Sequence, residues 1–312
     1  MADKKKYIWC TYRDWSFKIL EAIQDIPDWE TGLIVTTQDC IYDFERFENR
    51  EIPIIKIKTE KAKVEFQKGG IVYDKIMNIC PETIITSGWS WYIPKEILEY
   101  RPCVTYHPGK LPKDRGGSPI QNQMRNGEKW TYVNVMKQEE GLDEGGIYLR
   151  NKISLDGYAD DVWKRMTSAG VLLTKEYLLG LSSGSLKPKA QSDETPTICK
   201  RVRAEDAELN PANQSALQMY NIIRAHYETD PNSYVVPAYI NILNHFKIEI
   251  YKASLLNELD IKVVNFDDID EITQNINGII NEINNNKTIA ILKGNDNNCV
   301  YLSQIGISLY GK

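Results

Sequence analysis

The chain contains three histidines, and one of them stands where histidines often do chemistry. His107 follows the apolar run 103–106 and opens a segment rich in proline and glycine. A side chain at the carboxyl end of a strand can face a ligand, and an imidazole changes charge near neutral pH. Position alone does not distinguish two interpretations of His107. It is either a catalytic group or a loop histidine whose ring caps a backbone group. We expect His226 and His245 to be structural.

A carboxylate follows in a second glycine-bearing segment. Asp143 lies within 141–146, 36 residues after His107. The glycines there allow a tight backbone and the close approach of a ligand. An aspartate in such a segment more often binds its own backbone in a turn. On its own, Asp143 is therefore interpreted as a turn residue.

Strand-length apolar runs alternate with helical patterns up to His107, which predicts an α/β domain with a mostly parallel sheet. The expected strands are residues 5–11, 32–37, 53–58, 83–86 and 103–106. One helix is expected to start at Asp14 as its N-cap, a second covers 71–79, and a third opens at Pro94.

The segment 107–119 is expected to be a loop, because it holds three prolines and three glycines. Ser118 then caps a helix whose first residue is Pro119. Strands are predicted at 130–138 and 147–155, and a long helix over 160–180 closes the domain.

A second domain is predicted near the C-terminus, so that the domains cover 1–190 and 200–312. The polar stretch 183–198 has the composition of a linker, and an amphipathic helix is expected over 210–226. Short strands with turns between them favour a small β-barrel. The β-like runs are 234–240, 246–253, 261–266, 288–294 and 299–305, and 268–287 carries isoleucines at helical spacing.

Composition and charge exclude several classes of protein. Of 312 residues, 42% are hydrophobic and 26% charged, which is ordinary for a globular chain. Residues 201–312 hold 9 basic and 14 acidic side chains, so this half lacks the positive field that nucleic acid requires. The six cysteines form no CxxC pair and no metal spacing, and no run is long enough to span a membrane. We expect reduced thiols, no metal, no signal peptide and a cytoplasmic location.

Two ordered motifs resemble those of the 10-formyltetrahydrofolate-dependent formyltransferases, which include glycinamide ribonucleotide, methionyl-tRNA and sugar-nucleotide enzymes. The sequence HPGKLPKDRGGSPI at 107–120 is similar to the family's histidine followed by SLLPxxRGxxPI. The sequence GLDEGG at 141–146 is similar to its GLDTG loop, at matching spacing. The resemblance covers 5–185 well and 200–312 loosely, and implies a Rossmann-like domain with a C-terminal OB-like barrel.

The resemblance also implies a mechanism, in which a primary amine attacks the formyl carbon of 10-formyltetrahydrofolate. His107 in its charged form would donate to the oxyanion of the tetrahedral intermediate. Asp143 would hold His107 protonated and accept the ammonium proton, directly or through a water. Neither a metal nor a covalent enzyme intermediate is required.

Thr105 departs from the family pattern, because it stands where the family has an asparagine whose amide donates to the oxyanion. A threonine hydroxyl can also donate, but it is shorter and points differently. Losing one such donor costs about 10²–10³ in rate. We hypothesise that Thr105 or a bound water takes over this task.

Two further segments are similar to sugar-nucleotide N-formyltransferases: TYRDW at 11–15 resembles SYRxW, and SGWSWYIP at 87–94 resembles GWSxxIP. The tRNA enzyme's basic insertion, RPxGRGxxLxPSPVK-like, has no counterpart in 36–53. The expected acceptor is therefore an amino-dideoxy sugar on UDP or dTDP, with a 4-amino sugar of surface-polysaccharide or flagellin-glycan pathways as the leading candidate. Residues 219–226 and 233–240, in contrast, resemble the start of the tRNA enzyme's second domain.

The resemblance assigns binding residues as well. Arg13 suits a pyrophosphate, basic loop residues attract anions, and for Tyr12 and Trp15 a packing role is equally good. The folate is expected at Gly88, Trp89, Leu111, Pro112, Glu140 and Gly141. The acceptor is expected at Tyr12, Arg13, Trp15, Lys110 and Arg115.

Two alternatives stay open: a methionyl-tRNA formyltransferase, and a non-catalytic protein that kept the folate pocket after Thr105 replaced the amide donor. The expected partners are small molecules, the folate co-substrate and the nucleotide-linked amino sugar. Membranes and nucleic acid are not expected as partners, and a homodimer is left open.

Overall fold

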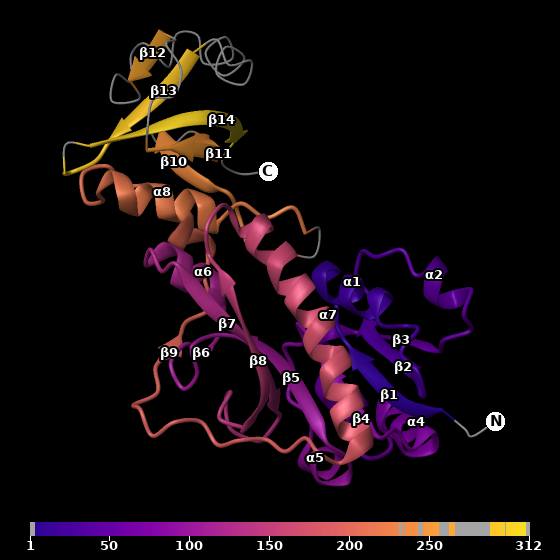
Figure 1. The fold of residues 1–312 in the computed structure, drawn as a ribbon. Helices are drawn as coiled ribbons and strands as arrows, with labels where there is room; N and C mark the ends of the chain where they lie inside the picture. Colours follow the sequence, from indigo (N-terminus) through magenta and orange to yellow (C-terminus); the bar gives the residue numbers. More distant parts are fainter. Residues whose placement is uncertain are drawn as a thin grey trace.

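A seven-stranded sheet carries helices on both faces in the first part of the chain, and a five-stranded sheet lies beyond them (Figure 1). The computed structural model describes residues 4–230, 233, 235–242, 246–255, 262–265, 288–296 and 298–309. The predicted order of an α/β, Rossmann-like domain followed by a small β domain is therefore confirmed.

The first sheet has the strand order β3-β2-β1-β4-β5-β7-β8. Its first five strands are parallel, whereas β7 pairs antiparallel with both of its neighbours. The bounds are β1 Lys5–Cys10, β2 Trp29–Thr37, β3 Ile54–Ile57, β4 Thr83–Thr86, β5 Cys103–Pro108, β7 Trp130–Lys137 and β8 Ile147–Ser154. Because β2 and β4 flank β1, the strand order reverses there, and ligands of such sheets bind outside the carboxyl ends at that point.

Strand β1 shows why the strands of this sheet are continuous apolar runs in the sequence and do not alternate between apolar and polar residues. Tyr7 and Trp9 pack into one core with helices α1 and α7, while Ile8 and Cys10 pack into the other core with α4 and α5. Both faces are buried from Tyr7 to Cys10, so this part of the strand favours apolar side chains, whereas Lys5 and Lys6 begin the strand outside the core. The helices of this half are α1 Asp14–Ala22, α2 Glu45–Glu48, α3 Ala62–Glu65, α4 Ile71–Ile79, α5 Lys95–Tyr100, α6 Pro119–Arg125 and α7 Ala159–Ser183, with the 3₁₀ turn η1 at Thr59–Lys61.

Three local predictions need correction. Strand β5 continues through Pro108, so His107 lies on the strand and not in a loop, because antiparallel pairing with β7 extends β5 beyond its apolar run. Arg13, in an extended conformation, is the N-cap of α1, and Asp14 is the first helical residue. Ser118 is the N-cap residue of α6, as predicted, but its side chain makes no capping hydrogen bond to the helix, and its Oγ accepts one from the Val202 amide.

The C-terminal sheet confirms four of the predicted β runs, and the fifth, 234–240, is a strand only from Ala238 onward. It is curled and mostly antiparallel, with the order β10-β11-β14-β13-β12 and one parallel pair, β12 with β13. Helix α8 (Ala216–Ala225) packs on it, so the predicted helix at 210–226 begins later than expected. The bounds are β10 Ala238–Ile242, β11 Phe246–Ser254, β12 Lys262–Asn265, β13 Thr288–Lys293 and β14 Cys299–Leu309. The helix predicted at 268–287 lies outside the described residues.

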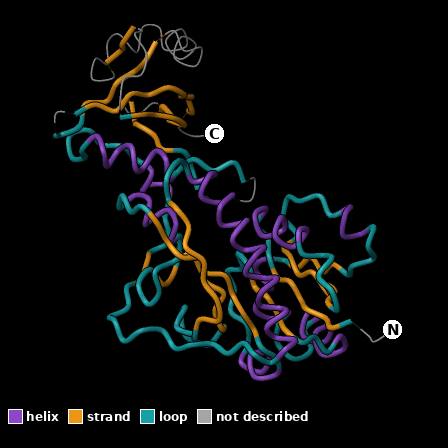
Figure 2. Tube along the Cα trace, viewed as in Figure 1, coloured by secondary structure: helices purple, strands orange, loops and turns teal. Residues whose placement is uncertain are grey.

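The segment between the two sheets is not a free tether. In Figure 2 it runs as a loop from the end of α7 along the outside of the first sheet. It then forms β9 (Ile198–Cys199), which pairs with the short strand β6 (Arg115–Gly116), and the turn η2 (Ala204–Ala207). Across the described ranges, none of the helices combines the length and the apolar character needed to cross a membrane.

Candidate active site

The two residues singled out from the sequence meet at the edge of the first sheet. His107 Nδ1 lies 3.3 Å from Asp143 Oδ2, although the two side chains come from strand β5 and from the loop between β7 and β8. His107 is 5% exposed. Asp143 Oδ2 also accepts a hydrogen bond of 2.8 Å from the Gly116 amide, which fixes the carboxylate in place. The predicted proximity of His107 and Asp143 is confirmed.

The far side of the imidazole is also occupied. His107 Nε2 lies 2.6 Å from the carbonyl oxygen of Asp114, and a carbonyl can only accept, so Nε2 carries a hydrogen. Both ring nitrogens therefore face oxygen atoms, Nδ1 that of Asp143 and Nε2 that of Asp114. Asn134 on β7 supports this end of β5, because its Nδ2 donates to the carbonyls of His107 and Gly109.

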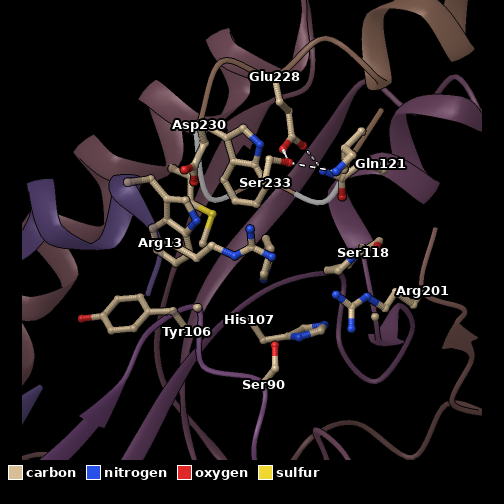
Figure 3. Close-up of a pocket in the computed structure, with 18 of the residues that line it drawn as sticks. Arg13, Ser90, Tyr106, His107, Ser118, Gln121, Arg201, Glu228, Asp230 and Ser233 are labelled. Atoms are coloured by element: carbon tan, nitrogen blue, oxygen red, sulfur yellow. Dashed lines mark hydrogen bonds between the residues drawn. The ribbon is translucent and has the colours of Figure 1, made fainter. Parts of the chain in front are cut away.

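A cavity of about 220 Å³ opens on one side of His107 (Figure 3). The loop after β1 contributes Arg13, and the start of α6 contributes Ser118 and Gln121. Arg201 from the linker and Glu228 from the segment after α8 face the same space (Figure 3). Residues from both parts of the chain thus surround one cavity, which holds charges of both signs.

Glu228 is a cavity residue that the sequence did not reveal. Its carboxylate accepts hydrogen bonds from the Gln121 amide and the Ser233 hydroxyl. Burial raises the pKa of the Glu228 carboxyl above its ordinary value. No local motif marks this position, because the chain reaches the cavity only after the linker and α8. Asp230 also lines the cavity, near Arg13 in Figure 3.

A second cavity, of about 310 Å³, lies on the other side of the pair. Its walls include Thr105, Gly141 and Asp143, and the tryptophans Trp89 and Trp91, whose ring centroids are 4.8 Å apart. Trp89 also lines the first cavity, so the two cavities adjoin. The Trp89 indole Nε1 is buried with no hydrogen-bond partner among the described residues. A bound polar group could satisfy this donor.

Most residues predicted to bind ligands line one of these cavities. The first cavity includes Tyr12, Arg13, Trp15, Gly88 and Trp89. Gly88 has φ of 66°, and a Cβ atom there would lie 2.6 Å from Arg13 Cγ, so only glycine lets the arginine pass so close. Trp15 is 8% exposed and stacks on Trp163, so its ring serves mainly as packing.

Five other predicted residues lie outside both cavities. Lys110 forms an ion pair with Glu128, Glu140 pairs with Lys95, and Arg115 donates to Gln191. Leu111, with Lys110, lines a separate hollow beside β8, and Pro112 lines neither cavity. The structure therefore gives no contact of these five residues with the two cavities beside His107 and Asp143.

Metal ligands are not grouped in this region. Among the residues that the structure describes, no three His, Cys, Asp or Glu side chains gather closely enough to hold an ion. The paired groups of the site are thus one imidazole and one carboxylate, those of His107 and Asp143, beside two adjoining cavities that can hold two molecules.

Comparison with known families decides what kind of domain holds this pair. The family model described as formyl transferase matches residues 18–172. Residues 18–172 form a formyl transferase domain. The match extends from α1 into α7, so it includes β5, which carries His107, and the loop that carries Asp143.

Relatives that match this chain are methionyl-tRNA formyltransferases by name. One from Nitratiruptor sp. is 30% identical over 177 residues, which is 56% of each chain. Another, from Mycoplasma mycoides, is 24% identical over 265 residues, 83% of this chain and 81% of its own. The chain thus spans little more than half the length of the first relative.

Solved structures share the architecture. Methionyl-tRNA formyltransferase from Clostridium thermocellum has a TM-score of 0.61 and 25% identity, covering 82% of this chain and 95% of its own. An N-formyltransferase from Helicobacter canadensis, solved with folinic acid and dTDP-3-aminofucose, has a TM-score of 0.62 and covers 97% of this chain and all of its own. At 15% identity the second likeness shows the fold alone.

Proposed function

We propose that this formyl transferase moves the formyl group of 10-formyltetrahydrofolate onto the primary amine of an amino-dideoxy sugar linked to UDP or dTDP. The observation that carries the proposal is the position of the His107–Asp143 pair between two adjoining cavities. A transfer between two molecules needs both to reach one set of catalytic groups, and holding them there removes much of the entropic barrier.

The two residues divide the chemistry. The acceptor amine attacks the formyl carbon, and negative charge develops on the formyl oxygen. His107 in its charged form donates a hydrogen bond to that oxygen from Nε2, which must first leave the Asp114 carbonyl. Thr105, on the wall of the second cavity, stands at the family's asparagine position and is the candidate for a second donor. Asp143 keeps His107 protonated and accepts the proton that the amine nitrogen loses after it has attacked the formyl carbon. The bond from the formyl carbon to the folate nitrogen then breaks, and that nitrogen takes up a proton.

The second cavity is the proposed folate site. Trp89 and Trp91 give it an apolar wall that suits a flat pterin ring, and the buried Trp89 indole N–H can donate to a ring heteroatom. Gly141 lies in the loop that presents Asp143, so the backbone there can approach the ligand closely. The formyl group would then point toward Thr105 and the catalytic pair.

The first cavity is the proposed acceptor site. Arg13 and Arg201 bring two guanidinium groups, whose planar forks match phosphate oxygens. Glu228 and Asp230 bring carboxylates, which accept hydrogen bonds from sugar hydroxyls or from an ammonium group. A nucleoside diphosphate carrying an amino sugar has both kinds of group in one molecule.

A transfer RNA acceptor is the second candidate, because the relatives reported above carry that name. Against it stand the excess of acidic over basic side chains in residues 201–312 and the missing basic insertion at 36–53. A tRNA-binding surface relies on many phosphate contacts, which this half of the chain does not supply.

A panel assay tests the choice. The protein is incubated with 10-formyltetrahydrofolate and, in separate reactions, with UDP- and dTDP-linked amino sugars or methionyl-tRNA, and each acceptor is weighed by mass spectrometry. We expect at least one amino sugar to gain one formyl group and methionyl-tRNA to gain none. Formylation of methionyl-tRNA alone would replace the sugar proposal with the tRNA one.

A further inference from the structure

The linker and β9 brace two segments beside the catalytic pair, the β6 segment and the start of β8. On one side, the amides of Arg115 and Gly117 donate to the carbonyls of Thr197 and Cys199, at 3.0 Å each. On the other side, Lys189 and Ile147 exchange two backbone hydrogen bonds of 2.7 and 2.9 Å. A segment that its composition predicts to be flexible is therefore fixed at two points beside the site.

Gln191 lies between these two points, and its side chain joins the loops directly. Its Nε2 donates to the Asp143 carbonyl at 2.8 Å and to the Gly145 carbonyl at 3.0 Å. Its Oε1 accepts from Arg115 Nη2 at 2.8 Å and from Nε at 3.3 Å. One amide thus spans the Asp143 loop and the β6 segment, and all of its strong donors and acceptors are used.

The Asp143 backbone needs such support. Its φ is 48°, a left-handed conformation that costs a residue with a side chain about 1 kcal/mol or more. Residues keep such conformations only when their surroundings determine them. The hydrogen bond from Gln191 holds the carbonyl of this same residue, and the Gly116 amide holds its carboxylate.

We propose that Gln191 is a positioning residue for formyl transfer: it holds Asp143 in the left-handed conformation that aims the carboxylate at His107. The proposal rests on the proposed function and adds the linker to the catalytic apparatus. Gln191 lines neither the first nor the second cavity, so it acts through Asp143 and not through a substrate. The same contacts make the catalytic geometry depend on the path of the chain toward the C-terminal sheet.

The test compares three variants of the full chain. Gln191→Met keeps the length of the side chain and removes its hydrogen bonds, whereas Gln191→Glu keeps the contact to Arg115 and loses both donors to the carbonyls. Ser192→Met changes the exposed neighbour and is the matched control. We expect both Gln191 variants to lower kcat by about 10- to 100-fold, because a displacement of about 1 Å at a reacting group has an effect of this size. KM for either substrate should change by less than about twofold, since ground-state binding is untouched.

The outcomes separate this proposal from the proposed function. A raised KM with unchanged kcat, or full activity in Gln191→Glu, would overturn it, because the amide donors would then not matter for the chemical step. Should the wild type transfer no formyl group, the imidazole nitrogen resonances of His107 still report the geometry without any substrate. They should shift in Gln191→Met and stay unchanged in Ser192→Met, and equal spectra for wild type and Gln191→Met would refute the positioning role.

Discussion

At the scale of single residues, the site depends on Asp143, which makes several contacts at once. Asp143 Oδ2 faces the imidazole of His107 and accepts from the Gly116 amide, while the Asp143 carbonyl accepts from Gln191. Each contact restricts the carboxylate further, so its direction is set by three different segments of the chain. Preorganised groups of this kind stabilise developing charge without having to move during the reaction.

His107→Asn and Asp143→Asn should each lower kcat by about 10²–10⁴-fold, the range found for positioned acid–base groups. Both residues act on the transition state, so folate binding should persist. Tryptophan fluorescence can follow that binding, because Trp89 and Trp91 line the second cavity. If either variant kept more than about a tenth of the wild-type rate, the proposed division of tasks would be wrong.

Thr105→Val should lower kcat by about 10²–10³-fold if its hydroxyl donates to the oxyanion. The valine has the same shape, so loss of packing is not a competing cause. Thr105→Asn is the informative companion, because it introduces the amide that the family carries at this position. Steady-state kcat of the two variants decides the matter, and full turnover by Thr105→Val would show that another donor acts.

At the scale of elements, helix α7 determines how well the first sheet is covered. It packs against α1 and β8 and buries one or two residues per turn in the core, among them Met166, Leu173 and Leu178. Its opposite side is exposed, as at Leu172 and Leu179. The buried side of α7 therefore provides its contact with the first sheet, and its exposed side contributes little.

Neighbouring leucines on α7 provide a matched test. Leu178 is fully buried, and Leu179 is 54% exposed. Leu178→Ala should lower the free energy of unfolding by about 2–5 kcal/mol through lost burial and the cavity left behind. Leu179→Ala should change it by less than about 0.5 kcal/mol. Urea unfolding of both variants measures the difference, and similar losses would mean that the register of α7 differs from the one described.

At the scale of the whole molecule, buried polar contacts at the end of α8 join the C-terminal part of the chain to the first part. Arg224 at the end of α8 is 4% exposed and donates to the carbonyls of Leu155, Gly157 and Met124. His226 follows it, is 2% exposed, and its Nδ1 lies 3.0 Å from the Val236 carbonyl. The chain leaves this joint directly toward Glu228, so the joint also positions one wall of the first cavity.

His226 should make stability depend on pH. Burial lowers its pKa from 6.5 to about 4, so the unfolded chain takes up a proton at this residue over that interval and the folded chain does not. Its contribution to stability is therefore complete above about pH 6.5 and is lost as the pH falls toward 4, by about 1.4 kcal/mol per pH unit. Glu228, whose pKa is raised, acts in the opposite direction.

The measurement is urea unfolding at pH 7 and pH 5 of the wild type and of His226→Asn, which keeps a donor for Val236. The loss of unfolding free energy between the two pH values should be smaller in the variant by about 2 kcal/mol. Only the difference between the two proteins is interpreted, so the effect of Glu228 cancels. Equal losses of unfolding free energy in the two proteins would mean that burial does not lower the pKa of His226 in the folded chain.

The sequence by itself determined the strands, most of the helices and the two motifs. Runs such as 5–11 and 83–86 predicted buried parallel strands, because a strand covered on both faces favours apolar and β-branched side chains over charged ones. The identities and spacing of His107 and Asp143 singled out the reactive groups. These are local properties, and they do not depend on how distant segments meet.

Tertiary structure decided what lies around those groups. The extension of β5 to Pro108 depends on pairing with β7, the left-handed Asp143 on hydrogen bonds from the linker, and the place of Glu228 on the path of the chain after α8. Contacts between residues far apart in the chain leave no periodic signal, so composition suggested a flexible linker where the fold has a brace. Similarly, the charges of Lys110 and Arg115 suggested that they bind the acceptor. In the structure they contact Glu128 and Gln191 and line neither of the two cavities.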